Sequence, residues 1–365
     1  MANLCCHRRT ILAVLLVCLT LFGNLLVQWP SMWNTFLRPK LAKSDVPVNI
    51  TNTTILVWSW ASGPTERLRG NVCKDRYGIP NCILTADRSL FPQADFVIFH
   101  NRELLNGQRL PLHLSRPHKQ RWVWYSRVSP GHSGDLKRFA GQFNYTMSYR
   151  RDADFFAPYG WLEPHSVGTG MTVDDFIPKE KSSLACWVVS NFKGKHRRTL
   201  IYNKLKKVIP VDMYGEAVHR RLPKKDLLPT ISHCYFYLTF ENSIAEDYIT
   251  EKLWRNAFGG GAVPVVLGPP RKSYEAMIPK DSFIHVDDFS SVEELGKFLK
   301  KLAGDRERYA TYFKWKLNYT VATYSNFLLE PYCKICTKLT TLQTPKVYWD
   351  LQAWDWKTNR KASIN

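Results

Sequence analysis

The chain carries one long apolar run near its start, and short apolar stretches alternate with polar segments after it. Residues 11–29 are almost wholly apolar, and Arg8 and Arg9 precede them. Such a run is long enough to cross a bilayer, and positive residues before it place the short N-terminus in the cytosol. The pattern predicts a type II signal anchor behind a cytoplasmic tail, residues 1–10. A cleaved signal peptide is the alternative, but the run is longer than its usual apolar region, and no small-x-small cleavage site follows.

Four apolar stretches in the first half of the chain predict the strands of an α/β domain. They are Ile55–Trp58, Phe96–His100, Trp122–Ser126 and Tyr145–Tyr149, and polar or basic segments separate them. A stretch rich in Pro, Gly and Ser follows at Ala157–Ser183 and is the expected linker.

Strands and helices alternate after this linker, which predicts a parallel sheet covered on both faces. The expected strands are Ala185–Ser190, Val211–Tyr214, Cys234–Phe240, Ala262–Leu267 and Phe283–Val286, and the expected helices are His196–Lys207, Thr250–Phe258 and Ser291–Leu302. Ligands of such sheets bind at the carboxyl ends of strands, near helix N-termini that can hold phosphate. The residues after Phe240 have this placement. Val347–Trp356 is rich in aromatic residues and is expected to form a short helix packed in a core.

Polar side chains crowd the segment from Phe240 to Lys252, FENSIAEDYITEK. Polar groups that follow a buried strand are costly unless they are used. A helix start with an adjacent lysine can hold a diphosphate, while a carboxylate can bind sugar hydroxyls or stabilise positive charge on an anomeric carbon. A capped helix with ordinary surface charges is the alternative that the pattern leaves open.

The net charge and the N-glycosylation sequons are both consistent with a large lumenal portion after the anchor. The net charge is +20, and basic runs such as Lys193–Arg198 are typical of nucleic-acid binding in a cytosolic protein. The anchor argues against that class and leaves sugar-nucleotide phosphates, anionic membrane or glycan surfaces, and solubility. Four Asn-x-Ser/Thr sequons follow the anchor, at Asn49, Asn52, Asn144 and Asn318.

Six of the nine cysteines follow the anchor, so they can pair completely in an oxidising lumen. They are Cys73, Cys82, Cys186, Cys234, Cys333 and Cys336. Cys333 and Cys336 have a spacing seen in zinc sites, but the other close pair does not, so no metal is expected. Cys5 and Cys6 lie beside the membrane and are either palmitoylated or free thiols.

Several motifs together resemble the alpha-1,3-fucosyltransferases of glycosyltransferase family 10, closest to the vertebrate Lewis-type enzymes. The resemblance covers nearly all of the lumenal portion, and the spacing of FENS and DYITEK is its most specific part. The motifs are TILVWSW (54–60), LTADRSL (84–90), YRRDADFFAPYG (149–160), CWVVSN (186–191), the FENS and DYITEKL block, and VPVVLGP (263–269).

The resemblance implies a GT-B architecture of two facing Rossmann-like domains in a Golgi-membrane protein. The implied parts are a stem (30–53), an acceptor-side domain (54–160), a GDP-fucose-binding domain (161–336) and a tail that packs back on the first domain (337–365). Matching cysteine positions imply a bridge between Cys186 and Cys234, and bridges from Cys73 and Cys82 to Cys333 and Cys336.

The motif positions also imply a donor site for GDP-fucose. The residues implied to surround the donor are Ser190, Asn191, Arg198, Tyr214, Glu241, Asn242, Tyr248, Glu251 and Lys252. Arg198 and Lys252 suit the diphosphate, and Glu251 would stabilise charge or orient the donor. The family inverts the anomeric centre and does not depend on a DxD metal motif, so Asp152-Ala-Asp154 is interpreted as structural, with no cofactor required.

The segment Phe99–Glu103 resembles the family's acceptor-specificity motif. Arg102 holds the position where arginine accompanies type 2 N-acetyllactosamine and an alpha-1,3 linkage, whereas Asn101 departs from the usual histidine. The resemblance therefore implies Lewis x type products on glycoproteins or glycolipids. An exposed arginine of no consequence is the alternative, and a homodimer is left open.

The family's general base is a glutamate, and the matching position here is Val128. General-base assistance contributes about 100- to 10,000-fold, so its loss predicts a weak enzyme that still binds the donor. His132 and Asp135 lie in the same loop and are candidate substitutes, although each is also explained as a solvated loop residue. The competing hypotheses are a weakly active or inactive GDP-fucose-binding paralogue and a lectin-like module that binds acceptor glycans.

Overall fold

The structure is a computed structural model that describes residues 52–59, 68, 70–166, 170–323, 329–342 and 346–357. The predicted tail, the anchor, Cys5, Cys6, Asn49 and all but the last residues of the stem lie outside this set. Within the described residues, no helix is both long enough and apolar enough to cross a membrane.

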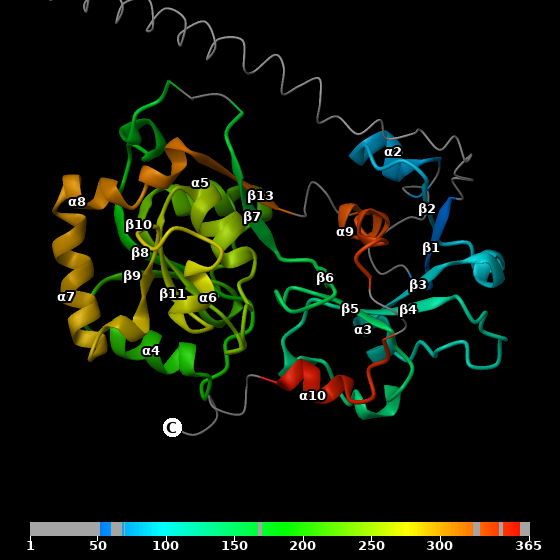
Figure 1. The fold of residues 1–365 in the computed structure, drawn as a ribbon. Coiled ribbons are helices and arrows are strands. Elements are labelled where there is room, and N and C mark those ends of the chain that lie inside the picture. Colours follow the sequence, from blue (N-terminus) through cyan, green and yellow to red (C-terminus); the bar gives the residue numbers. More distant parts are fainter. Residues whose placement is uncertain are drawn as a thin grey trace, which may run out of the picture. The chain divides into compact units, whose positions relative to one another are not determined.

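The first half of the described chain builds a six-stranded sheet with parallel neighbours, in the order β2-β1-β3-β4-β5-β6 (Figure 1). The four strands expected from the sequence are confirmed, and β2 and β6 add to them. The bounds are β1 (Thr53–Val57), β2 (Cys82–Thr85), β3 (Phe96–His100), β4 (Arg121–Ser126), β5 (Tyr145–Ser148) and β6 (Phe155–Phe156), with helices α2 (Val72–Tyr77) and α3 (Asn101–Leu105).

Both faces of this sheet are buried, because successive side chains of a strand point to opposite sides. Val97 and Phe99 pack in a cluster with Trp122, whereas Ile98 and Val123 pack in a second cluster on the other face. The sheet therefore lies within a core, and its carboxyl-terminal strand ends are where loops can carry polar groups.

The second half builds a five-stranded parallel sheet in the order β12-β11-β10-β8-β9. All five expected strands are confirmed as β8 (Ser183–Val188), β9 (Val211–Tyr214), β10 (Cys234–Phe240), β11 (Val263–Leu267) and β12 (Ile284–His285). The helices are α4 (Arg197–Leu205), α5 (Leu227–Ser232), α6 (Arg271–Glu275), α7 (Val292–Ala303), α8 (Arg306–Thr311) and the π-helical turn η8 (Lys252–Phe258).

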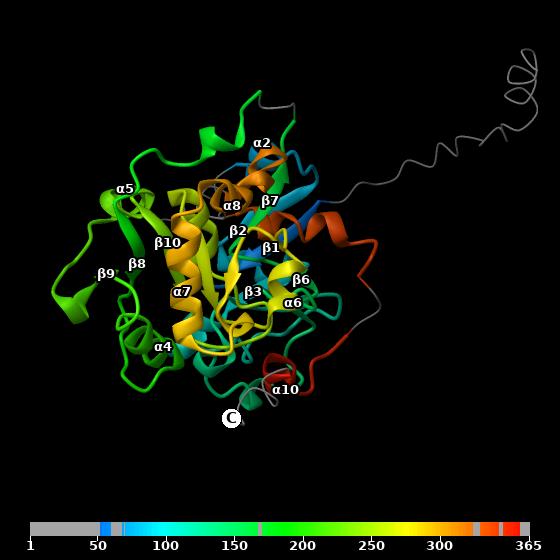
Figure 2. The same cartoon turned by 90° about the vertical axis from the view of Figure 1, so that its left-hand side faces the viewer.

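Helices cover both faces of the second sheet, as the alternation of elements predicts. Phe236 and Leu238 share a cluster with Leu295 and Leu299 of α7, whereas Tyr237 points to the opposite cluster with residues of α5 and η8. Figures 1 and 2 show α7 beside the sheet and next to α4, which it contacts.

The expected linker is not wholly irregular. Gly160–Pro164 forms strand β7, which pairs antiparallel with β13 (Tyr319–Thr323). A Cβ atom at Gly160 would lie 2.6 Å from the Trp254 ring, so a glycine is required for this close approach. The linker prediction misses β7 because its partner strand is far away in the sequence.

The end of the described chain packs on the first sheet. Leu329 and helix α9 (Glu330–Cys333) belong to a core cluster of that sheet, so the chain returns to it before the expected boundary at residue 336. The three implied disulfides are confirmed: Cys73–Cys333, Cys82–Cys336 and Cys186–Cys234. The domain boundaries stay predictions.

The aromatic C-terminal segment forms the short helix α10 (Leu351–Trp356), which confirms its expected place in a core. Trp354 packs edge-on against Trp124, with ring centroids 6.1 Å apart, and the Arg150 guanidinium lies over the Trp354 ring. The Asp355 carboxylate is buried beside them, and one of its oxygens has no hydrogen-bond partner.

Asp355 should make folding stability depend on pH. Burial raises its pKa to about 6, while a hydrogen bond from Ser133 and the charge of Arg150 oppose the shift. The unfolded chain releases this proton at lower pH than the folded chain, so stability falls as pH rises from about 4 to about 6 and the loss persists above.

Because two pKa units correspond to about 3 kcal/mol, we expect Asp355→Asn to melt higher than the native protein at pH 7. Thermal unfolding checks this: the difference in Tm should shrink as pH is lowered to 4, and a pH-independent difference would contradict it.

Candidate active site

Polar residues from three neighbouring strands meet at one edge of the second sheet. Ser190 and Asn191 follow β8, Tyr214 ends β9, and Glu241 and Asn242 follow β10. Strands β10, β8 and β9 are adjacent and parallel, so their carboxyl ends lie together. The sequence-predicted donor residues of these strands are therefore brought to one place.

Gly215 allows the ends of β8 and β9 to approach closely. Its φ is 135°, and a Cβ atom there would lie 2.0 Å from the Val189 carbonyl oxygen. Any other residue would clash with the backbone and be strained. This glycine fixes the position of Tyr214, whose ring is covered by the Arg220 guanidinium at 4.5 Å.

Arg198 is a buried cation whose hydrogen-bonding capacity is incompletely used. It lies in the first turn of α4 and is 4% exposed, and its Nη2 donates to the Asn191 carbonyl oxygen. Its Nε has no partner, and neither does the buried Oδ1 of Asn242. Burial lowers the pKa of Arg198, while Glu241 and Tyr248 lie close enough to raise it. Because buried charges normally pair, an anionic ligand would complete this position.

Lys252 is already paired, which differs from its expected role as a diphosphate ligand. Its Nζ donates to Glu241 Oε2 and to Thr250 Oγ1, both at 2.8 Å, and lies 3.4 Å from Glu251 Oε1. Thr250 also donates its backbone N–H and its hydroxyl to Glu241. Burial opposes the charge of Lys252, but Glu241 and Glu251 raise its pKa, so it remains an ammonium group. Direct contact of Lys252 with the donor stays a prediction.

Glu251 stands at the edge of this network. Its side chain is 42% exposed, and although burial acts to raise its pKa, Lys252 and Arg255 hold the pKa below the ordinary value. The carboxylate is therefore ionised and accessible, which suits orientation of a sugar or stabilisation of positive charge. Its catalytic role stays a prediction.

Tyr248 joins the two halves of the described chain through aromatic contacts. Its ring lies edge-on to Tyr149, at 5.1 Å, and to Tyr159, at 6.2 Å. The preceding residue, Asp247, has a positive φ of 58° and accepts hydrogen bonds from the backbone and side chain of Arg151. This ion pair holds a strained residue, which is a feature of functional sites.

The loop after β4 reaches the same place. The Ser129 hydroxyl donates to the Ser243 hydroxyl of the FENS segment at 2.8 Å, and the Tyr159 hydroxyl donates to the Arg127 carbonyl oxygen. Val128 is half-buried in this loop and offers no proton acceptor, as expected from its side chain. The Asp135 carboxylate instead accepts from the backbone N–H of Lys137, which gives it a local structural role.

Several polar groups at the carboxyl ends of the first sheet were not apparent in the sequence. The hydroxyls of Ser59 and Ser126, after β1 and at the end of β4, are buried without partners, and so is that of Tyr149. Ligands of parallel sheets bind at such ends, so these groups are candidates for acceptor contacts. Single serines and tyrosines have no sequence signal that distinguishes them from structural ones.

The amide of one predicted glycosylation site is held inside the folded chain, and glycosylation at this site stays a prediction. Asn144 is 5% exposed, its Nδ2 donates to the Lys346 carbonyl oxygen, and its Oδ1 accepts from the Trp122 N–H. A glycan on Nδ2 would displace these contacts and the C-terminal segment. Asn52 and Asn318 are exposed, and their glycosylation stays a prediction.

Both aspartates of the Asp152-Ala-Asp154 motif have structural partners. Asp152 forms a two-pronged ion pair with Arg150, and Asp154 accepts from Thr146, Lys346 and Tyr348. Across the part of the chain that the structure describes, no group of three or more His, Cys, Asp or Glu residues is placed to hold a metal ion.

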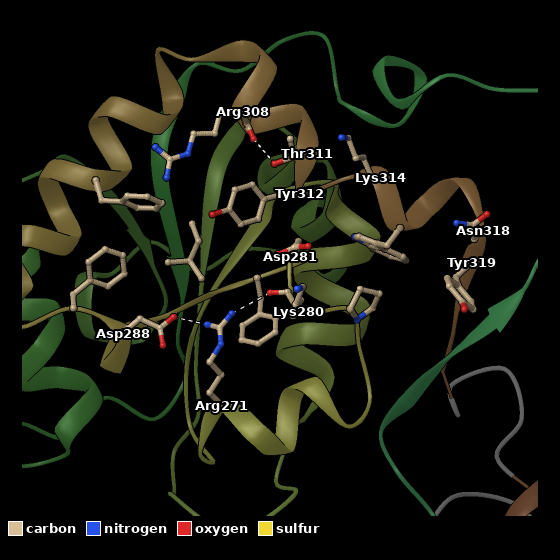
Figure 3. Close-up of a pocket in the computed structure, with 16 residues that line it drawn as sticks. Arg271, Lys280, Asp281, Asp288, Arg308, Thr311, Tyr312, Lys314, Asn318 and Tyr319 are labelled. Atoms are coloured by element: carbon tan, nitrogen blue, oxygen red, sulfur yellow. Dashed lines mark hydrogen bonds and ion pairs between the residues drawn. The ribbon is translucent and has the colours of Figure 1, made fainter.

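A separate cavity of about 570 Å³ lies in the second half and contains none of the predicted donor residues (Figure 3). Arg271 is its most prominent cation, but its guanidinium already pairs with Asp288 and Glu275 and donates to the Lys280 carbonyl oxygen. The Arg271 guanidinium is therefore satisfied by the protein, whereas Arg198 keeps an Nε without a partner.

Comparison with known proteins relates the chain to fucosyltransferases over both sheets. Residues 50–160 match the family described as Fucosyltransferase, N-terminal, and residues 178–354 match Glycosyltransferase family 10 (fucosyltransferase) C-term. Alpha-(1,3)-fucosyltransferase 7 of Mus musculus is 46% identical over 315 residues, which cover 86% of this chain and 78% of that protein. The 4-galactosyl-N-acetylglucosaminide 3-alpha-L-fucosyltransferase 9 of Bos taurus is 40% identical over 351 residues, which cover 95% of each chain.

A solved alpha1,3-fucosyltransferase with GDP has a TM-score of 0.49 and 16% identity, and the match covers 84% of this chain and 94% of that one. The sequence matches extend over both sheets and over the FENS segment. The chain therefore belongs to glycosyltransferase family 10, and within it to the alpha-1,3-fucosyltransferases.

Proposed function

We propose that this chain transfers L-fucose from GDP-fucose to the GlcNAc of type 2 N-acetyllactosamine glycans, with inversion of the anomeric carbon. Its products are of the Lewis x type, on glycoproteins or glycolipids. Residues 11–29 anchor it in the Golgi membrane as a single-pass type II protein, and the bulk of the chain is lumenal.

The observation that carries the proposal is the incompletely bonded cluster at the strand ends of the second sheet. Arg198 and Asn242 each have a buried polar atom without a partner, and a ligand with both anionic and donor groups would satisfy them. A nucleoside diphosphate sugar supplies phosphate oxygens for the guanidinium and hydroxyls for the amide oxygen. Glu241 links this position to Lys252 and Glu251, because it acts on the charge of Arg198 and pairs with Lys252, which in turn lies beside Glu251.

A two-domain GT-B arrangement is supported by the contacts between the loops of the two sheets. The Ser129–Ser243 hydrogen bond and the Arg151–Asp247 ion pair bring acceptor-side loops to the donor segment. Inversion requires that an acceptor hydroxyl held by these loops approach the sugar from the side opposite the leaving diphosphate.

The acceptor is supported by the relatives and by Arg102. A relative that is 40% identical is named for transfer of fucose to position 3 of a galactosyl-N-acetylglucosaminide. Arg102 is exposed in α3, and a side chain there can touch a sugar without rearrangement of the core. These two features together support a type 2 acceptor.

The full-length chain in detergent should fucosylate N-acetyllactosamine in preference to its type 1 isomer. We expect Arg102→Trp to lower the type 2 to type 1 ratio of kcat/KM by about tenfold or more, since pocket contacts discriminate substrates on this scale. Competition between the two acceptors, with product linkage read by NMR, measures the ratio. Exclusive fucosylation of the type 1 isomer by the native chain, or an unchanged ratio in the variant, would contradict the proposed specificity.

A further inference from the structure

The loop after β4 holds a histidine in a defined orientation at the donor segment. His132 ends a short turn, Pro130–His132, and its backbone N–H donates to the Ser129 carbonyl oxygen at 2.8 Å. Asn101 is buried and binds the same loop, because its Nδ2 donates to the Ser133 carbonyl oxygen at 3.0 Å. The Oδ1 of Asn101 accepts a hydrogen bond from the Trp124 ring N–H. The loop is thus fixed to the sheet while the His132 side chain is exposed.

Two hydrogen bonds determine which imidazole nitrogen of His132 carries the hydrogen. Ser129 Oγ donates its single hydrogen to Ser243 Oγ at 2.8 Å, and His132 Nδ1 lies 2.9 Å from the same Ser129 oxygen. A hydroxyl has one hydrogen to donate, so the second bond requires Nδ1–H as the donor. In this tautomer Nε2 carries the lone pair that can accept a proton, and the residue is exposed.

The position of His132 is next to the proposed donor. Ser243 belongs to the FENS segment that contains Glu241 and Asn242. Burial lowers the pKa of His196 at the start of α4, and Arg198, Lys193 and His132 lower it further, so His132 also lies within electrostatic reach of the helix that carries Arg198. The hydrogen bond to Ser243 and the electrostatic effect on His196 involve different segments of the second half, and both place His132 near the proposed donor site.

We infer that His132 is the general base of this enzyme and replaces the carboxylate that Val128 lacks. The inference rests on the proposed function and deepens it. As the acceptor hydroxyl oxygen bonds to C1 of fucose, the bond from C1 to the diphosphate oxygen breaks and GDP leaves with the electron pair. The hydroxyl proton passes to His132 Nε2, and the imidazolium then returns it to solvent.

Steady-state kinetics of the full-length chain in detergent test the inference through His132→Gln. The glutamine keeps a hydrogen-bonding side chain but cannot take the proton, so kcat should fall by about 100- to 10,000-fold. GDP affinity measured by titration calorimetry, and the acceptor KM, should stay within about threefold of native. The matched control is His113→Gln, at an exposed histidine in a different loop, which should leave kcat unchanged.

Rescue distinguishes a base from a structural residue. Val128→Glu in the His132→Gln background should recover kcat by at least about tenfold, because a carboxylate then supplies the missing acceptor. His132→Gln with native kcat, or with loss of GDP affinity as large as the loss of kcat, would overturn the role of His132 alone. A native chain that transfers no fucose until Val128→Glu is introduced would overturn both this inference and the proposed function.

Discussion

Replacement of Arg198 by alanine is expected to weaken GDP binding by on the order of 100-fold or more. Arg198 is 4% exposed, it has an Nε without a partner, and the ion pairs found in the described residues do not include it. Loss of one partner from a buried, hydrogen-bonded charge pair costs about 2 to 5 kcal/mol. The diphosphate is the partner that would lose its guanidinium.

Without GDP, the same substitution should not lower the melting temperature, although it weakens GDP binding. The free protein holds an incompletely paired buried cation, so Arg198→Ala should melt at the native temperature or above it. GDP should raise the Tm of the native protein through linkage and leave the variant unchanged at the same concentration. Calorimetric titration and thermal shift with GDP check both effects.

Two further variants refine the test of Arg198. Arg198→Lys keeps the charge but loses the planar fork, so it should fall between native and alanine. Arg306→Ala removes an exposed guanidinium, 81% accessible, and should bind GDP as the native protein does.

An undiminished thermal shift in Arg198→Ala would place the diphosphate elsewhere. Glycan binding that persists without any GDP response in the native chain would indicate a lectin-like module.

The ion pair between Glu241 and Lys252 should dominate local stability. The Glu241 side chain is 1% exposed and that of Lys252 18%, and their charged atoms lie 2.8 Å apart. Glu241→Gln leaves a buried ammonium without its main partner, which costs about 3 to 5 kcal/mol. At roughly 2 to 4 °C per kcal/mol, Tm should fall by roughly 6 to 20 °C.

A double-mutant cycle separates this pair from its surroundings. Lys252→Met alone should also destabilise, but the double variant should lose less than the sum of the two, because each charge is costly only while the other is missing. Denaturant unfolding of the four proteins measures the coupling. Additive losses would show that the two charges do not depend on each other, and that Lys252 is free to serve the donor instead.

Much of the second sheet is predictable because its strands have strong local signals. β9 and β10 begin and end where the apolar pattern does, and the FENS segment follows β10 as expected. β7 is different, because it is a short strand bounded by Gly160 and Pro164 and its partner is β13, more than a hundred residues later. A pairing between segments so distant leaves no local periodicity.

In the site, the sequence predicts which residues come together, but not which partners they bind. Motif positions predict that Arg198, Glu241 and Lys252 lie together, and the structure places them so. The sequence does not reveal that Lys252 is held by Glu241, nor that Asp247 adopts a positive φ to meet Arg151. Asn144 matches a glycosylation motif, yet its amide holds the C-terminal segment. Partner choice depends on tertiary contacts, which a motif does not encode.

Fucose transfer by the native chain decides whether this protein is an active enzyme despite Val128. The protein is incubated with GDP-fucose and N-acetyllactosamine, and mass spectrometry follows the acceptor while free GDP is quantified. We expect the acceptor to gain one deoxyhexose for each GDP released, without any change at Val128. GDP binding with no transfer, together with activity that first appears in Val128→Glu, would contradict it and identify a donor-binding protein that does not catalyse.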